Sequence, residues 1–486
     1  MAFTDFRRTK IVATVGPTSE QEDVLSELVV NGANVFRLNF SHGTHDEHLK
    51  RIETIRKVSD KLGQKVAILA DLQGPKIRCG KVQEGGILLI NGEQLTITTD
   101  DVLGAGSRVS TGYKSMPTEV KPNDRILLDD GLLELKVLRI EDEKEIITEV
   151  VCGGILTSNK GINLPHVELK TPALTEKDEE DLVFILKQDV DFVALSFVRR
   201  ASDLQYVYDI MDTEGRHLPV ISKIEKPEAL ECIDEIIEAS YGLMVARGDL
   251  GVEIAQERVP LEQKSMIKKC NRLGKPVIVA TQMMDSMIRN PRPTRAEISD
   301  IANAVLDGAS AVMLSGETAS GKFPVLAVKT MGEVCQATEN EIICKEDYVE
   351  PKLDFEFGTD AEGLCYGAVR LAARKKAKMI LSITETGRTA KELSRFRPTQ
   401  PIFAVICKSA PARNELCLHW GVQMIEMDTF ELTDQFFGKI EKMIENHPSI
   451  EEDDLVVITA GVPFLHKTPT NMVKIHRVKK GEKAFL

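Results

Sequence analysis

The feature that most constrains the fold is a repeated pairing of a short apolar run with a segment of helical spacing. Eight such runs occur, at residues 9–16, 35–40, 66–72, 192–198, 220–225, 243–246, 277–281 and 311–314. The segment 227–239 is typical of the spacers, because its apolar residues fall on one face of a helix. Eight strand-helix units fit a closed (β/α)8 TIM barrel, which takes about 250 residues. A doubly wound open sheet is the alternative, and the regularity of the units favours closure.

The alternation of apolar runs with segments of helical spacing stops between residues 76 and 171. Short alternating runs replace helical spacing there, and Asn91-Gly92 and Asp130-Gly131 are strong hairpin signals. We therefore expect a small β-barrel inserted into the larger barrel, as a lid hinged on its joints. Its polar stretch at 158–163 is positioned to reach back over the site.

A third segment follows a polar linker and resumes an α/β pattern. Strands are predicted at residues 379–384, 401–407, 422–427, 455–460 and 472–478. The predicted domains are therefore a catalytic barrel at 1–75 and 172–343, the lid at 76–171, and a carboxyl-terminal α/β domain at 344–486.

Composition excludes several classes of function. The chain has 486 residues, a net charge of -13 and 42% hydrophobic residues, and no apolar run approaches the roughly 18 residues that a membrane helix needs. The acidic balance argues against a nucleic-acid partner. The first ten residues are polar and basic, without a secretory signal, and the nine cysteines lack a Cys-x-x-Cys motif. We expect a cytoplasmic protein with no membrane partner.

Polar residues gather at the carboxyl ends of the predicted strands. A single charge at a strand end is more often a solvated loop residue than a functional one, so only the repetition is informative. In barrels of this kind these ends form the active site. The rim comprises Arg37, Asn39, Ser41, Asp71, Ser196, Phe197, Arg199, Lys223, Glu225, Arg247, Gly248, Asp249, Thr281, Gln282, Ser315 and Glu317.

Arginine and lysine facing two carboxylates indicate a site that handles negative charge through a divalent metal. Glu225 and Asp249 supply hard oxygen ligands of the kind that Mg²⁺ prefers. Lys223 and Arg37 would surround a phosphoryl group, and phosphoryl transfer requires mainly alignment and charge stabilisation. Thr281 would face the organic part of the substrate and take part in a proton relay.

Three other motifs require a decision. Thr384-Glu-Thr-Gly-Arg-Thr389 combines hydroxyls, a glycine and an arginine before a helix, which suits a phosphate pocket and, equally, an ordinary capped helix start. His42, His45 and His48 begin a segment rich in acidic residues, and we interpret them as a solvated helix face, not a metal site. Residues 316–322 have the spacing of a P-loop, but Phe323 stands where the metal-binding hydroxyl is needed.

The motifs together resemble the pyruvate kinase family from Arg8 to about Val478. They are Thr9-Lys-Ile-Val-Ala-Thr-Val-Gly16-Pro17, Arg37-Leu-Asn-Phe-Ser-His-Gly43, Asp71-Leu-Gln-Gly-Pro-Lys-Ile-Arg78, Lys223-Ile-Glu225, Met244-Val-Ala-Arg-Gly-Asp-Leu-Gly251, Ala280-Thr-Gln-Met-Met284 and Met313-Leu-Ser-Gly-Glu-Thr318. The resemblance implies a barrel, a lid and an allosteric carboxyl-terminal domain in a homotetramer. It also implies transfer of phosphate from phosphoenolpyruvate to ADP, giving pyruvate and ATP.

The same resemblance assigns roles to individual residues. It implies that Arg37 and Lys223 bind the phosphoryl group and that Glu225 and Asp249 bind Mg²⁺ or Mn²⁺. The backbone around Ala246, Arg247 and Gly248 would bind the substrate carboxylate, and Thr281 would lie on the proton path. Arg78 and Lys160 would contact the nucleotide.

Two parts of the resemblance concern regulation. Many family members hold K⁺ near Asn39, Ser41, Asp71 and Leu72 and have a glutamate where this chain has Lys76. A lysine ammonium there would replace the monovalent cation, so we predict activity without K⁺. Effector-binding residues are predicted at Thr384, Thr386, Gly387, Arg388 and Thr389, for a phosphorylated sugar or a nucleotide monophosphate.

Two competing functions remain from the residues alone. Lys223 is also the type of residue that forms a Schiff base in a lyase or aldolase acting on a 2-oxo acid. A catalytically silent metabolite sensor is the second alternative, although it predicts gaps in the rim that the sequence does not have.

Overall fold

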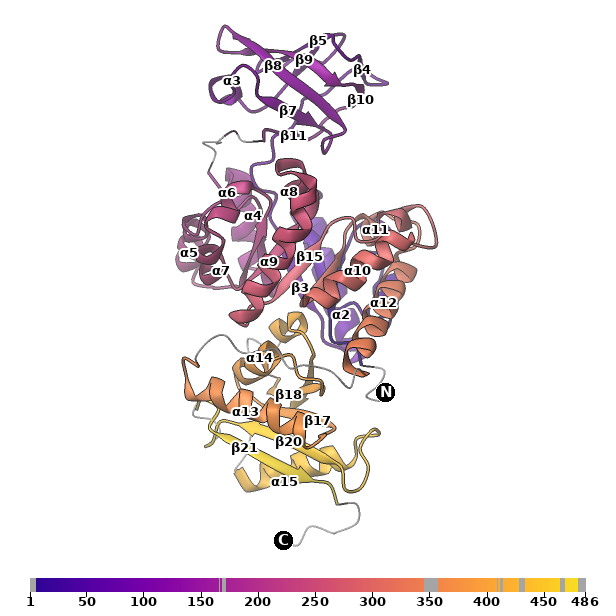
Figure 1. Cartoon of the computed structure of the whole chain (residues 1–486), viewed down its shortest axis with the longest axis vertical. Coiled ribbons are helices and arrows are strands. Elements are labelled where there is room, and N and C mark those ends of the chain that lie inside the picture. The colour runs from indigo at the N-terminus through magenta and orange to yellow at the C-terminus, as the bar shows by residue number, and fades with distance from the viewer. Residues whose placement is uncertain are drawn as a thin grey trace.

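Three domains lie in a row along the long axis of the molecule, with the barrel in the middle (Figure 1). The computed structural model describes residues 6–165, 167, 172–344, 357–408, 410, 414–427, 433–463 and 468–479. The all-β insertion lies at one end of the barrel and the carboxyl-terminal α/β domain at the other.

The predicted closed barrel is confirmed. Eight strands pair in the order β1-β16-β15-β14-β13-β12-β3-β2, and β1 and β2 close the ring with parallel pairing. The strands are β1 (Lys10–Thr14), β2 (Val35–Asn39), β3 (Ala67–Asp71), β12 (Phe192–Leu195), β13 (Val220–Ile224), β14 (Gly242–Ala246), β15 (Val277–Ala280) and β16 (Ala311–Leu314).

Strand alternation explains why the apolar runs are nearly continuous. Val12, Leu69 and Met244 point into the barrel and pack together there, whereas their neighbours Ile11 and Ile68 point outward to a separate core under the helices. Both faces of a parallel barrel strand are covered, so both carry apolar side chains. Phe192 begins β12 and fills the barrel interior at the amino-terminal ends of the strands.

Helices surround the barrel. They are α1 (Glu22–Val30), α2 (His45–Leu62), α4 (Glu176–Leu186), α5 (Ser202–Glu214), α6 (Pro227–Glu231), α7 (Ile233–Ala239), α8 (Arg247–Glu253), α9 (Val259–Arg272), α10 (Arg295–Asp307), α11 (Gly316–Ala319) and α12 (Pro324–Cys344), with 3₁₀ turns η2 (Gln256–Arg258) and η3 (Asp285–Ile288).

Two details differ from the sequence-based expectation. The single helix expected at 227–239 is divided into α6 and α7 at Cys232, whose backbone leaves the helical region and whose thiol lies 3.3 Å from the carbonyls of Arg199 and Glu228. Most barrel strands also end one to three residues early. The remaining residues turn out of the ladder, and Phe197 and Thr281 adopt positive φ values of 54° and 74°.

The insertion is all-β, as expected. It forms a six-stranded sheet in the order β11-β7-β8-β9-β5-β6 and a two-stranded sheet of β10 and β4, which share one apolar core. Its elements are β4 (Ile87–Leu89), β5 (Gln94–Thr98), β6 (Arg108–Ser110), α3 (Met116–Glu119), β7 (Arg125–Leu128), β8 (Leu133–Glu141), β9 (Glu145–Cys152), β10 (Gly154–Leu156) and β11 (Ile162–Asn163).

The carboxyl-terminal domain is a five-stranded sheet with helices on both faces. Its strands are ordered β19-β18-β17-β20-β21, with only β21 antiparallel. The elements are α13 (Asp360–Arg374), β17 (Met379–Ile383), α14 (Arg388–Arg395), β18 (Ile402–Cys407), η4 (Asn414–Leu418), β19 (Val422–Met427), α15 (Thr433–Glu445), β20 (Leu455–Ala460) and β21 (Met472–Arg477). Residues from α13 and α14 pack on one face and residues from α15 on the other.

Polar contacts join this domain to the amino-terminal ends of the barrel strands, which we call the barrel floor. The buried Lys10 ammonium donates to the carbonyl of Val422 at 2.6 Å. The Arg397 guanidinium donates to the carbonyl of Gly308 at 2.6 Å. The carboxyl-terminal domain is therefore fixed at the end of the barrel opposite the strand ends that carry the polar rim.

The expectation of a solvated helix face is wrong for His48, which is buried, and the side chains of both His45 and His48 have structural partners. His45 lies 2.7 Å from Asp181 and stacks on Phe184, while His48 contacts the carbonyl of His42 at 2.9 Å. Among the residues that the structure describes, no helix is both long and apolar enough to cross a membrane.

Candidate active site

A continuous set of ion pairs crosses the rim from β2 to β13. Arg37 Nε lies 2.6 Å from an Asp71 carboxylate oxygen, and Lys223 Nζ lies 3.2 Å from the other. Lys223 also lies 3.1 Å from Glu225. Because the strands are parallel, their carboxyl ends bring together Arg37 and Asp71, 34 residues apart in the sequence, and Asp71 and Lys223, 152 residues apart.

These charges are largely removed from water. The side chains of Asp71 and Glu225 are 1% exposed, and those of Arg37 and Lys223 are 11% and 12% exposed. Burial raises the pKa of Asp71, but Lys223 and Arg37 outweigh it and the pKa lies below its ordinary value. Burial lowers the pKa of Lys223, yet Asp71 and Glu225 raise it to about 12. The ammonium is therefore charged throughout the neutral range.

Ser196 holds the lysine in place. Its hydroxyl accepts from Lys223 Nζ at 2.6 Å and donates to the carbonyl of Leu72 at 2.7 Å. The sequence placed Ser196 on the rim without a role. Its position directly after β12, which lies between β3 and β13, allows it to bridge the two strands on either side.

Glu225 has a backbone donor as well as a cation. The Phe197 N–H donates to it at 2.7 Å, and the positive φ of Phe197 turns that N–H toward the site. Burial and the negative charge of Asp249 raise the pKa of Glu225, while Lys223 opposes them. The two predicted metal ligands are thus close enough to repel each other.

Asp249 is paired with the insertion. Lys76 Nζ lies 3.1 Å from an Asp249 oxygen, and both side chains are about a quarter exposed, at 25% and 24%. The aliphatic end of Lys76 also passes beside Gly161, in the polar stretch that was expected to reach over the site. Asn163, in that stretch, donates to Glu253 of α8 at 2.9 Å. The insertion therefore touches the rim at Asp249 and at Glu253, both on α8.

The turn after β14 leans on the turn after β15. A Cβ on Gly248 would lie 2.6 Å from Cγ2 of Thr281. The Arg247 guanidinium points away from the centre, pairing with Asp300 at 2.7 Å and donating to the carbonyl of Thr281 at 2.8 Å. Because the Arg247 side chain is engaged elsewhere, only the backbone of the predicted carboxylate-binding segment, Ala246 to Gly248, is left to contact a ligand.

The remaining predicted residues lie in two groups. Asn39 Oδ1 accepts from the N–H of Ser41 at 3.2 Å, beside Asp71 and Leu72, which is the predicted monovalent-cation region. Arg78 donates to the carbonyl of Asn159 at 3.2 Å, and Lys160 pairs with Asp129 at 2.8 Å. Arg78 and Lys160 are therefore neighbours on the insertion, separate from the ion pairs of the barrel.

Two supporting residues had no role in the sequence-based interpretation. Glu317 accepts from the N–H groups of Met284 and Ser315 at 3.0 and 2.7 Å, which joins the last two strand-end turns. Asp178 accepts from the N–H of Gly74 at 3.0 Å, at the joint with the insertion. Nothing local in the sequence identifies such long-range backbone acceptors.

The donor set fits a hard divalent cation. Within the described chain, no three His, Cys, Asp or Glu side chains are grouped to hold an ion. Mg²⁺ does not need such a cage, because it is commonly bound by one or two carboxylates together with water and substrate oxygens. Glu225 and Asp249 provide those carboxylates from adjacent strands, and each is neutralised by a lysine, Lys223 and Lys76 respectively.

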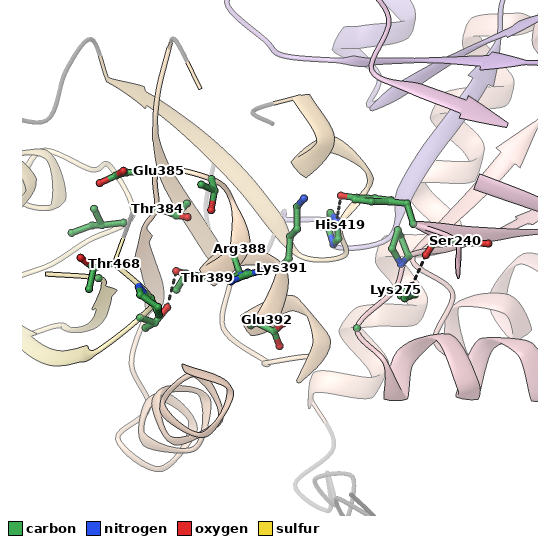
Figure 2. A pocket seen from close by; sticks show the side chains of 18 residues that line it. Ser240, Lys275, Thr384, Glu385, Arg388, Thr389, Lys391, Glu392, His419 and Thr468 are labelled. Carbon is green, nitrogen blue, oxygen red and sulfur yellow. Dashed lines mark hydrogen bonds between the residues drawn. The ribbon is translucent and has the colours of Figure 1, made fainter. Parts of the chain in front are cut away.

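The loop at residues 384–389 borders a separate cavity of about 640 Å³ between the carboxyl-terminal domain and the barrel floor (Figure 2). Thr384 Oγ1 accepts from the N–H of Gly387 at 2.9 Å, and Thr389 shares a 2.8 Å hydrogen bond with Thr470. Gly387 has a φ of 79°, so the loop turns tightly into α14. Arg388 and Thr386 line the same cavity.

A closed barrel with paired cations and carboxylates at its strand ends, an insertion over them and an α/β domain on its floor define a barrel enzyme for an anionic substrate. Comparison with known proteins gives the family. The model for the barrel domain of pyruvate kinase matches residues 6–328, and that for its alpha/beta domain matches residues 362–476.

Similar proteins agree with this assignment. The chain is 45% identical to a pyruvate kinase from Geobacillus stearothermophilus, over 97% of this chain and 80% of the relative. It is also 45% identical to a pyruvate kinase from Corynebacterium efficiens, over 97% and 98% of the two chains. A crystal structure of a pyruvate kinase from Cryptosporidium parvum superposes with a TM-score of 0.88 at 37% identity, covering 97% and 96%. The chain belongs to the pyruvate kinase family and is a phosphotransferase.

We predict that Gly248→Ala lowers turnover by about 10²-fold, the loss that a displacement of roughly 1 Å at a reacting group can cause. The added methyl group meets Thr281, whose branched side chain and positive φ leave it little room to move. Steady-state turnover measures the effect. Gly251→Ala on the same helix is the control, because its added Cβ would lie at an ordinary 3.6 Å from Val259. Equal activity of the two variants would contradict the prediction.

Proposed function

We propose that this chain transfers the phosphoryl group of phosphoenolpyruvate to ADP, giving pyruvate and ATP. The observation that supports it best is the buried set of ion pairs from Arg37 through Asp71 and Lys223 to Glu225. Two fixed cations beside a carboxylate pair suit a substrate that carries both a phosphate and a carboxylate. Family membership supplies the identity of the substrates.

The positions of the side chains support the proposed roles. Lys223 and Arg37 hold the phosphoryl oxygens, and Asp71 and Ser196 keep Lys223 in place. Glu225 and Asp249 hold Mg²⁺ or Mn²⁺. The ion supplies charge neutralisation and alignment of the phosphate oxygens. The backbone of Ala246 to Gly248 receives the substrate carboxylate, where N–H groups favour an anion.

The chemistry requires one bond exchange and one proton. An oxygen of the ADP β-phosphate attacks phosphorus, and the bond from phosphorus to the enol oxygen breaks. The resulting enolate takes a proton at its methylene carbon along a path that includes Thr281. Arg78 and Lys160, on the insertion, contact the nucleotide, so that movement of the insertion governs access and water exclusion.

The Schiff-base alternative conflicts with the state of Lys223. A lysine that attacks a carbonyl must be a neutral amine. The pKa of Lys223 is raised to about 12, because Asp71 and Glu225 outweigh burial. The silent-sensor alternative is disfavoured by the intact set of Lys223, Glu225, Asp249 and Thr281 at the strand ends.

We predict that Lys223→Met nearly abolishes ATP formation, by about 10²- to 10³-fold, because the loss of one preorganised donor to a developing charge lowers turnover by that factor. Coupled assay of pyruvate formation measures turnover, and Mn²⁺ titration together with circular dichroism checks that metal binding and the fold persist. Lys187→Met, on an exposed lysine, is the control. Retained turnover in Lys223→Met would show that the role is wrong, and borohydride labelling of Lys223 with pyruvate would favour the lyase.

We infer that the enzyme does not need K⁺. The Lys76 ammonium pairs with Asp249 at 3.1 Å, whereas Asp71 of the predicted cation region pairs with Arg37 and Lys223. Lys76 thus supplies a monovalent positive charge to the same rim, beside the carboxylate pair Glu225 and Asp249. In tetramethylammonium buffer we expect full activity of the natural chain and strong K⁺ activation of Lys76→Glu. Lys81→Glu, on the surface of the insertion, controls for a change of overall charge. A large rise in activity of the natural chain on adding K⁺ would disprove the inference.

We also infer a cytoplasmic homotetramer whose effector site is the cavity beside the loop 384–389. The ligand is a phosphorylated sugar or a nucleotide monophosphate. Thr384, Thr386, Gly387, Arg388 and Thr389 would hold its phosphate. Within the described part of the chain, the exposed Arg388 side chain has no carboxylate within 4 Å, so its charge is available to a ligand.

We predict that a panel of sugar phosphates and AMP contains an activator, and that Arg388→Gln weakens its binding by about tenfold or more, because hydrogen bonds to charged groups are worth about 1.5–3 kcal/mol. Isothermal titration calorimetry measures the affinity. Basal turnover stays unchanged in Arg388→Gln, and the exposed Arg374→Gln on α13 retains normal effector binding. A flat response to the whole panel would count against an effector site.

A further inference from the structure

The barrel floor contributes an aromatic residue to the effector cavity. Tyr241 lies directly before β14 and lines the cavity together with Ser240, Lys275 and Pro276. Its hydroxyl group lies 2.8 Å from Nε2 of His419, in the carboxyl-terminal domain. The tyrosine therefore belongs to the barrel but has its hydrogen-bond partner on the other domain.

A charged residue of the cavity covers the same ring. Lys391 Nζ lies 4.9 Å from the centre of the Tyr241 ring and 2.5 Å from Glu415. Lys391 also lines the cavity, on α14 one turn after the loop 384–389. An anion bound there competes with Glu415 and the ring for the lysine ammonium. Occupancy of the cavity thus changes the surroundings of Tyr241 directly.

Tyr241 is in turn tied to two strands that end in the active site. It immediately precedes β14, which runs fully buried to Ala246, and the turn with Gly248 and Asp249 follows. A strand of five residues spans about 17 Å. The ring also packs on Phe192 with centroids 5.7 Å apart, and Phe192 begins β12, which leads to Ser196 and Phe197. The residues after β12 contact Lys223 and Glu225, and the segment after β14 contains Asp249.

The Tyr241–His419 contact persists across the neutral range. Burial, together with the nearby charges of Lys391, Lys10 and Arg397, lowers the pKa of His419 well below its ordinary value. The imidazole is therefore neutral, with one ring nitrogen available to the phenol. Burial raises the pKa of Tyr241 well above its ordinary value, and Glu415 adds to that shift, so the phenol keeps its proton.

We propose that Tyr241 is the positioning residue through which a phosphate-bearing ligand in the cavity acts on the catalytic turn after β14. The inference rests on the proposed effector function of the cavity. The ligand draws Lys391 toward its phosphate, the packing of the Tyr241 ring between Lys391, His419 and Phe192 changes, and β14 transmits the change to Gly248 and Asp249. The barrel floor then relays the state of the cavity to the strand ends and is not only a support for the second domain.

The test uses Tyr241→Phe in the full-length enzyme, with inorganic phosphate, ribose 5-phosphate, glucose 6-phosphate and AMP as probes. For the natural chain, we expect the effective probe to lower the concentration of phosphoenolpyruvate needed for half-saturation about fivefold or more, which is a typical allosteric coupling. The phenylalanine variant should bind that probe normally and show the same kcat at saturating substrate. The change in its half-saturation on adding the probe should be less than about half of that in the natural chain. Tyr206→Phe, on an exposed tyrosine of α5, is the control and keeps the full response.

Reciprocal binding provides a second readout. Phosphoenolpyruvate must tighten binding of the probe by the same factor by which the probe tightens binding of phosphoenolpyruvate. Both measurements of this coupling factor should decrease in Tyr241→Phe. They should also decrease in His419→Gln, which removes the imidazole on the other side of the contact. A full response in both variants would overturn the role of Tyr241 while leaving the effector site intact. Loss of kcat without any probe would also overturn it, since that outcome marks a purely structural residue. If no probe binds the natural chain, the proposed effector function fails and this inference fails with it.

Discussion

The structure depends on a buried carboxylate, Asp71, that holds two cations. Arg37 and Lys223 reach it from β2 and β13, and the three charges are largely removed from water. Removing one member of a buried ion pair commonly costs about 3–5 kcal/mol, because it leaves an uncompensated charge. Asp71 therefore lets the barrel keep two positive charges in a fixed position before any substrate arrives. Positioned in advance, they require no reorganisation when charge develops on a phosphoryl group.

Much of this arrangement was predictable from the sequence. The apolar runs, their spacing and the polar residues that follow them predicted a closed barrel and the membership of its rim. The positions of Arg37, Asp71, Lys223 and Glu225 follow directly, because parallel strands end at one edge. The inserted and carboxyl-terminal domains were also predicted correctly as all-β and α/β, from hairpin signals and renewed strand-helix rhythm.

What the sequence could not provide is the set of partners that are distant along the chain. Ser196 as the bridge to Lys223, and the N–H of Phe197 as a donor to Glu225, depend on which strands are neighbours and on where the backbone leaves the ladder. At the break, the thiol of Cys232 meets the carbonyl of Arg199, a contact 33 residues away along the chain that the local sequence does not predict. The cavity beside the loop 384–389 is walled partly by the barrel floor, so no local pattern in either domain predicts it.

The charges of the rim also explain why the insertion belongs to the site. Three cations, Arg37, Lys223 and Lys76, contact three carboxylates, Asp71, Glu225 and Asp249. Lys76 is the member that comes from the insertion, so the insertion supplies the positive charge beside Asp249. Because Glu225 and Asp249 repel each other, the Lys76 ammonium lowers the electrostatic cost of holding the two carboxylates close together. The insertion is therefore tied to the electrostatics of the carboxylate pair through Lys76.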